Sequence, residues 1–378
     1  MGLGVERATA RHTGGWRPTF RAEILLVPIR SINADIEAGR VTAREAALKI
    51  AAVVSVVGSL VVASPIGTAQ TPSGRTDTAI QVVLLGTAGG PTFDARRIGI
   101  GTLVRAGQEL LLFDAGRAVS TGMVRAGISP ADVTKVFLTH LHSDHIVSVP
   151  ELYLFPWSSQ GRNKPLQIWG PEGTRAMMDH LQEAFAFDIH IRRDVDEKFP
   201  ADGIKAIATD IREGVVYEAN GVKVTAFLVD HAPVVPAFGY RVDYRGHSVS
   251  LSGDTRPSDS LVKASEGVDV LIHEVGRWKQ DPLLSGPPDE FLPGSRTPRS
   301  QAKTIAEHHT DGEEAGRIFQ RVRPKLAIFS HYNNNIDLPN TLRLVRQTYA
   351  GPVEFGEESM TVDVGDTVTV QRSAGTPK

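Results

Sequence analysis

The sequence predicts a layered α/β protein. Apolar, partly β-branched runs of strand length alternate along the chain with segments of helical character. Five of these runs end directly at a histidine or an aspartate, which is improbable by chance in a chain with 12 histidines. Ligands collect at the carboxyl ends of strands in layered α/β proteins, so these strand ends predict one shared site.

Length, charge and cysteine content limit the number of domains, the partners and the metal ligands that the chain can have. The 378 residues, 41% hydrophobic, suit one large α/β domain or two small ones. Residues 1–69 carry eight basic and five acidic residues. The rest of the chain has 33 basic and 38 acidic residues, so its formal net charge is near −5. That charge gives no broad footprint for nucleic acid, so we expect no nucleic-acid partner, although a local basic patch is compatible with it. Because cysteine is absent, any metal must be held by His, Asp or Glu.

The N-terminal region has the pattern of an export signal. The uncharged apolar run 50–62 follows Arg44 and Lys49 and precedes small residues that end at Ala69. This order is typical of a signal peptide, which we place at residues 41–69. We therefore expect a periplasmic or secreted protein with no stable membrane span after cleavage. A membrane anchor formed by the uncleaved segment, and a buried helix, are the alternatives.

The signal lies unusually deep in the chain. A translation start near Val41 would explain this depth, and residues 1–40 would then be a mis-annotated extension. The polar residues 70–76 read as a linker. The folded domain is then expected over residues 77–378.

The first predicted strands of this domain occupy residues 79–86, 101–104 and 109–114. The first runs into a glycine-rich turn at 87–91, and no GK[ST] sequence follows that turn. We therefore interpret it as a tight turn near the site rather than as a phosphate-binding loop. The third strand ends at Asp114, where a carboxylate can either orient a metal-bound imidazole or serve as a simple turn residue.

The densest group of candidate ligands follows the next strand. The apolar run 135–139 leads into the sequence HLHSDH at residues 140–145. Imidazole nitrogens and carboxylate oxygens are the ligands that zinc and similar divalent metals prefer. One such ion takes about three or four protein ligands. The four candidates here cannot all face one ion, which favours a two-metal site.

Further strands repeat this arrangement after a predicted amphipathic helix at 171–187. The strands are expected at residues 222–229, 239–243, 247–252, 268–272 and 325–330. Candidate ligands or acid–base groups follow four of them, namely Asp230-His231, Asp254, His273-Glu274 and His331. These positions complete the predicted site.

The series HxHxDH, DH, SGDT, HE, HHT and SH resembles the metallo-β-lactamase superfamily, and within it the ribonuclease Z and arylsulfatase-like branch. The GTAGGP turn and the LLFDAG strand end fit the same branch. The likeness covers roughly residues 80–335. It implies an αββα sandwich with the metal site at one edge, and a metal-dependent hydrolase.

The resemblance also implies a set of metal ligands. Two divalent ions, expected to be Zn²⁺, would be held by five histidines and two aspartates. His140, His142 and His231 would hold the first ion, Asp144, His145 and His331 would hold the second, and Asp254 would bridge both.

Three residues are expected to move protons. In this branch a glutamate–histidine pair protonates the leaving group, which implies roles for Glu274 and His308. His309 competes with His308 because the local sequence is His-His-Thr. Asp144 would accept the proton of the attacking water.

Two departures from ribonuclease Z bear on the substrate. The long arm that grips tRNA in that enzyme lies between the positions of His231 and Asp254, which only 22 residues separate here. Conversely, residues 276–300 form a Pro-, Gly- and Ser-rich segment that is expected to be a lid. Its Trp278 and Phe291 would line an aromatic cleft, together with Phe155 and Trp157.

These features lead us to expect an exported two-zinc hydrolase of small sulfate esters or phosphodiesters with aryl-type leaving groups. Its partner would be a small-molecule substrate, and a homodimer is left open. The alternatives are a hydrolase of lactones, β-lactams or activated aryl substituents, a tRNA 3′-processing endonuclease, and a non-catalytic metal-binding domain.

Overall fold

The structure, a computed structural model, describes residues 78–91 and 93–372. The predicted N-terminal extension, the signal peptide and the whole linker at residues 70–76 lie outside the described residues, and these assignments stay predictions. Among the described helices, none is both long and apolar enough to cross a membrane.

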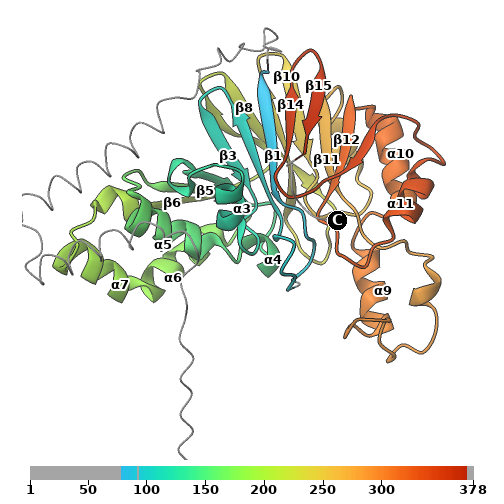
Figure 1. Cartoon of the computed structure of the whole chain (residues 1–378), viewed down its shortest axis with the longest axis horizontal. Coiled ribbons are helices and arrows are strands. Elements are labelled where there is room, and N and C mark those ends of the chain that lie inside the picture. The colour runs from blue at the N-terminus through green and yellow to red at the C-terminus, as the bar shows by residue number, and fades with distance from the viewer. Residues whose placement is uncertain (1–77, 92, 373–378) are drawn as a thin grey trace, which may run out of the picture. The chain divides into compact units, whose positions relative to one another are not determined.

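The strands form two sheets packed face to face (Figure 1). The eight-stranded sheet has the order β15-β14-β1-β2-β3-β4-β5-β6, and the seven-stranded sheet has the order β13-β12-β11-β10-β9-β8-β7. The strands are β1 (Ile80–Gly86), β2 (Gly101–Ala106), β3 (Glu109–Phe113), β4 (Lys135–Phe137), β5 (Leu166–Gly170), β6 (Ala206–Asp210), β7 (Gly214–Ala219), β8 (Val222–Val229), β9 (Ala237–Tyr244), β10 (His247–Leu251), β11 (Val270–Glu274), β12 (Leu326–Ser330), β13 (Val353–Phe355), β14 (Met360–Val364) and β15 (Val368–Gln371).

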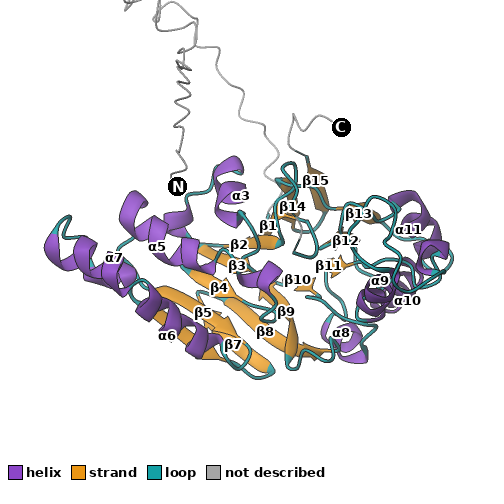
Figure 2. Cartoon of the chain, turned by 90° about the horizontal axis from the view of Figure 1, so that it is seen from below, coloured by secondary structure: helices purple, strands orange, loops and turns teal. Residues whose placement is uncertain are grey.

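Helices cover the outer faces of both sheets, which gives the predicted αββα sandwich (Figure 2). Helices α3, α5 and α6 pack on the first sheet, and α8 and α10 pack on the second. The described helices are α3 (Val119–Arg125), α4 (Ser143–Ile146), α5 (Val149–Gln160), α6 (Thr174–Ala184), α7 (Ala186–His190), α8 (Asp259–Ala264), α9 (Arg299–Glu307), α10 (Gly312–Val322) and α11 (Leu338–Val345).

The core between the sheets follows from the two-residue period of the strands. Alternate side chains of β1 and β11, such as Leu84 and Ile272, point inward and are almost fully buried. Aromatic rings fill the centre, where Phe113 and Phe137 stack with ring centroids 5.1 Å apart. Apolar residues on the opposite faces of the same strands pack against helices, so both faces of the central strands are apolar.

Most strands predicted from the sequence are present within two residues of their expected ends. Strands β5, β6 and β7 and the C-terminal strands β13 to β15 were not predicted from the sequence. The edge strands β6 and β7 are short and half-exposed, so they lack the continuous apolar run that marked the central strands.

The expectation that Trp157 lines a cleft is wrong. Its side chain is fully buried, its ring lies 5.5 Å from that of Phe199, and its Nε1 donates to the carbonyl of Pro200. Trp157 therefore packs α5 against the segment that contains Phe199 and Pro200. Phe155 is exposed on the other side of α5, in a surface groove that no predicted metal ligand lines.

Candidate metal centre

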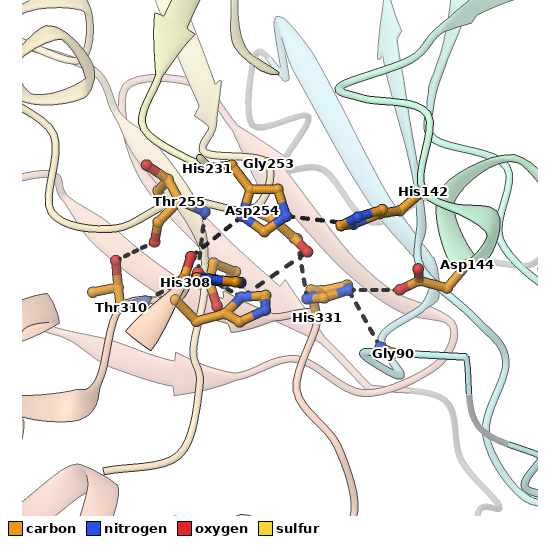
Figure 3. Close-up of polar contacts among 12 residues, drawn as sticks. Gly90, His142, Asp144, His231, Gly253, Asp254, Thr255, His308, Thr310 and His331 are labelled. Carbon is orange, nitrogen blue, oxygen red and sulfur yellow. Dashed lines mark hydrogen bonds and ion pairs between the residues drawn. The ribbon is translucent and has the colours of Figure 1, made fainter. Parts of the chain in front are cut away.

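The predicted ligands meet at one edge of the sandwich. Strands β10, β11 and β12 are parallel, so the segments that follow them emerge side by side. The segments that follow β4 in the first sheet and β8 in the second reach the same edge. Figure 3 shows His142 and Asp144 on one side of the centre and His231, Asp254 and His331 on the other.

One group of ring nitrogens is formed by three histidines. His140 Nε2 lies 3.0 Å from His142 Nδ1, and His231 Nε2 lies 3.4 Å from the same atom. His140 and His231 are buried, whereas His142 is exposed at the mouth of the site. The three nitrogens thus converge from two sheets on one point.

The second group contains a carboxylate. Asp144 Oδ2 lies 3.2 Å from His331 Nε2 and 3.5 Å from His145 Nε2. Asp254 lies between the two groups, with Oδ2 3.4 Å from His145 Nε2 and 4.0 Å from His140 Nε2. Its Oδ1 lies 3.1 Å from His331 Nδ1.

The donor set fits divalent metal ions. Three combinations of three of these groups, and a fourth in which His309 joins Asp254 and His331, each have all ligand atoms within 4.8 Å of one another. Ring nitrogens and carboxylate oxygens gathered this closely are the ligands of zinc and related first-row metals. Asp254 belongs to two of these sets, with His140 and His145 in one and with His309 and His331 in the other.

The back of the site fixes the ring orientations. Asp114 Oδ2 accepts a 2.8 Å hydrogen bond from His145 Nδ1, and Asp114 Oδ1 accepts one of 2.9 Å from the backbone N–H of Thr139. The hydroxyl of Thr139 in turn lies 3.0 Å from His140 Nδ1. These contacts turn Nε2 of both histidines toward the centre, so Asp114 makes the orienting contact expected of it.

The charges around the ligands favour a bound cation. Burial, together with the neighbouring His145, holds the pKa of His140 well below its usual value, and burial also lowers the pKa of His231. Both are therefore neutral at pH 7, which is the form that binds metals. At His145, burial acts against protonation, but Asp254 and Asp114 outweigh it and raise the pKa well above the usual value.

Glu274 contacts a different histidine from the one that was expected to pair with it. Glu274 Oε1 lies 3.1 Å from His309 Nδ1, not from His308, and also accepts 3.1 Å hydrogen bonds from the N–H groups of Thr255 and Thr310. Helix α9 ends at Glu307, and the turn that follows points the two histidines in different directions. His308 instead contributes its backbone carbonyl, which lies 3.2 Å from His231 Nδ1.

The environment of His309 suits a proton donor. Burial lowers its pKa, but the carboxylate of Glu274 outweighs this effect and raises the pKa to about 9. The ring is therefore protonated near neutral pH. By contrast, burial, Arg256 and His309 lower the pKa of His308. His309, with its Nδ1 4.0 Å from Asp254 Oδ2, is the histidine that Glu274 holds beside the ligands.

The glycine-rich turn and the segment after His331 close one side of the site. A Cβ at Gly89 would lie only 2.9 Å from the carbonyl of His331, so only glycine permits this approach. Arg97 donates to the carbonyl of Tyr332 and lies over its ring. His331 itself has a positive φ of 49°, a strained conformation that these contacts hold in place. The sequence analysis did not single out Arg97.

Comparisons with known proteins agree with this geometry. Residues 110–332 match the family described as "Beta-lactamase superfamily domain". The chain therefore belongs to the metallo-β-lactamase superfamily and is a metal-dependent hydrolase. Within it, the chain is 35% identical to Ribonuclease Z of Mycobacterium sp. (strain KMS) over 258 residues, which is 67% of this chain and 84% of that protein. It is 31% identical to Ribonuclease Z of Mycobacterium marinum (strain ATCC BAA-535 / M) over 75% of this chain and 99% of that protein.

Solved structures share the fold. The metallo-β-lactamase fold protein YhfI from Bacillus subtilis superposes with a TM-score of 0.57 at 20% identity, covering 75% of this chain and 98% of that one. Human tRNase Z, short form, superposes with a TM-score of 0.54 at 22% identity, covering 75% of this chain and 99% of that one.

The expectation of no nucleic-acid partner is wrong in the light of these relatives. Several proteins at 31–35% identity are named Ribonuclease Z, which is a nucleic-acid hydrolase by name. The net charge of the chain gave the wrong expectation because a whole-domain average does not describe the groups beside the site.

Proposed function

We propose that this chain is a zinc-dependent phosphodiesterase that cleaves RNA. The observation that carries the proposal is the Glu274–His309 pair beside the ligand set, in a chain about one-third identical to proteins named Ribonuclease Z. When bound, two zinc ions would supply Lewis-acid stabilisation of the phosphoryl oxygens and an activated water. His140, His142 and His231 would hold one ion, Asp144, His145 and His331 the other, and Asp254 both.

The protein's own groups would move two protons. Burial raises the pKa of Asp144, but the hydrogen bond with His331 outweighs it and holds the pKa below its usual value. Asp144 is then an ionised acceptor for a proton of the attacking water. His309 has Nδ1 bound to Glu274, so its Nε2–H is the proton available to the departing oxygen.

A proton donor of this kind favours ester substrates with poor leaving groups. The ribose oxygen released from an RNA phosphodiester is a strong base, and its departure needs a proton in the transition state. A lactone or an activated aryl substituent would gain less from such a donor.

RNA would have to be gripped outside the β9–β10 region. These strands are joined by the tight turn Arg245-Gly246, which leaves no room for a long arm. The segment 275–298, between β11 and α9, is a long loop beside the site. It packs on α9 through Leu284 and Leu292, so it is an ordered element that can contact a substrate.

The test uses the full chain, purified with zinc and assayed on labelled precursor tRNA, an unrelated single-stranded RNA and bis-p-nitrophenyl phosphate. We expect about two zinc ions per chain and cleavage of RNA. His309→Ala should lower kcat on RNA by about 10²–10⁴-fold, whereas the neighbouring change His308→Ala should not.

Cleavage of the small diester without any RNA cleavage would refute the RNA assignment. If a zinc-loaded chain cleaved neither RNA nor the small diester, the assignment as a phosphodiesterase would be refuted.

A further inference from the structure

Arg256 links the segments that carry different parts of the site. It lies two residues after Asp254, in the loop before α8, and its side chain is 28% exposed. Its Nη1 donates to Asp230 Oδ1 at 3.0 Å, and its Nη2 donates to the carbonyl of Ala232 at 2.9 Å. One end of the guanidinium therefore holds the residues on both sides of His231.

The remaining donor of the guanidinium, Nε, contacts the segment that leads to His308 and His309. Arg256 Nε donates to the carbonyl of Glu307 at 2.8 Å, at the end of α9 and two residues before His309. The backbone N–H of Arg256 also donates to the carbonyl of Asp230 at 2.7 Å. Arg256 thus bonds to the His231 segment and to the His308-His309 segment at the same time.

The two linked segments also touch each other directly. His231 Nδ1 lies 3.2 Å from the carbonyl of His308, and the hydroxyl of Thr310 donates to the carbonyl of Thr255 at 2.7 Å. The ring of His231 is therefore oriented by a carbonyl whose own position Arg256 fixes through the preceding residue. The proposed metal ligand His231 and the proposed proton donor His309 are therefore both positioned by the hydrogen bonds of Arg256.

We propose that Arg256 is a positioning residue that sets the orientation of His231 and the position of His309 together. The inference rests on the proposed metal-dependent hydrolysis at this site. Only a planar guanidinium can serve both segments, because its donors point in fixed, separate directions. Lysine carries all its donors on a single nitrogen and would not reproduce the three separate bonds that Arg256 makes from Nε, Nη1 and Nη2.

Arg241 offers a matched control. It is also partly buried, at 24% exposed, and its guanidinium donates to the carbonyls of Ala264 and Glu266 and to Asp243. It lies in the middle of β9, away from the ligands. Arg241→Ala removes the same kind of hydrogen bonds without touching the site.

The experiment compares Arg256→Ala, Arg256→Lys and Arg241→Ala in the full chain. Zinc affinity is measured by competition with a chromophoric chelator, and kcat and KM are measured on the substrate that the wild type cleaves, at saturating zinc. We expect both Arg256 variants to bind one zinc ion about tenfold more weakly, as is typical for lost ligand support. Their kcat should also fall at saturating zinc with KM nearly unchanged, and free guanidinium should partly restore kcat in Arg256→Ala.

The outcomes separate the inference from the proposed function. Wild-type zinc affinity in Arg256→Lys, or an equal loss in Arg241→Ala, would overturn the positioning role. If Arg256→Ala does not fold, Arg256→Lys alone decides. A wild-type chain that binds zinc but cleaves no ester would overturn the proposed function, while the zinc affinities would still test the support of His231.

Discussion

Replacing Asp114 by asparagine should weaken zinc binding at the site that contains His145. The carboxylate accepts from the N–H of Thr139 through Oδ1 and from His145 Nδ1 through Oδ2. An asparagine of the same shape has one acceptor and one N–H₂ group. If the amide oxygen keeps the Thr139 bond, the N–H₂ group faces His145 Nδ1 and favours the tautomer with the proton on Nε2, which cannot bind metal through that atom.

The size of the effect follows from the lost bond. A hydrogen bond to a charged group contributes about 1.5–3 kcal/mol. Because about 1.4 kcal/mol corresponds to tenfold in affinity, the affinity should fall about 10–100-fold. Zinc titration against a chelator resolves the two sites, and only the site of His145 should change.

Asp269→Asn is the matched control for this experiment. Asp269 is also buried, accepts a 2.8 Å hydrogen bond from the N–H of Ser248 and lies 3.3 Å from His247 Nδ1, away from the metal centre. The Asp269→Asn substitution should leave the affinities of both zinc sites unchanged. An unchanged affinity in a folded Asp114→Asn protein, or equal losses at both zinc sites, would refute the reasoning.

Three further predictions follow from the structure. The pKa of about 9 at His309 lies above the usual 6.5, so the protonated form persists at neutral pH and kcat/KM should fall above about pH 9. Glu274→Gln should move the midpoint of this fall to lower pH. An unmoved midpoint would contradict the pairing of Glu274 with His309. Replacing residues 285–296 by a short Gly/Ser linker should raise KM for RNA but not for a small diester, and parallel increases would count against substrate contact by this loop. Trp157→Ala should lower the free energy of unfolding by about 3–5 kcal/mol, as measured by denaturant titration, because the side chain is fully buried; a loss below about 1 kcal/mol would argue against that packing.

The sequence was most informative where chemistry is local. The HLHSDH segment and the strand ends at His231, Asp254 and His331 could be located because a ligand directly follows an apolar run. The choice between His308 and His309 could not be made this way, since it depends on the turn after α9 and on contacts with Glu274. The role of Arg256 is equally invisible, because its partners lie up to 51 residues away.

Trp157 is a different case, because a usable signal was present. The buried residues of α5 are spaced by three and four positions, at Val149, Leu152, Tyr153, Pro156 and Trp157, with Leu154 also buried. This is the stripe of a helix that faces a core, and Phe155 lies off it. Reading the period rather than the residue type would have placed Trp157 inside.

The metal centre is assembled from both layers of the sandwich, and this arrangement has a consequence for maturation. Segments after β4 in one sheet supply four of the proposed ligands, and strand ends of the other sheet supply three. A divalent metal would therefore bind tightly only when the two sheets have docked in register, so metal binding would favour the folded state. At a free zinc concentration 100 times the Kd, each site would add about 2.7 kcal/mol to the folded state. Metal supply would then affect the resistance of the protein to unfolding as well as its activity.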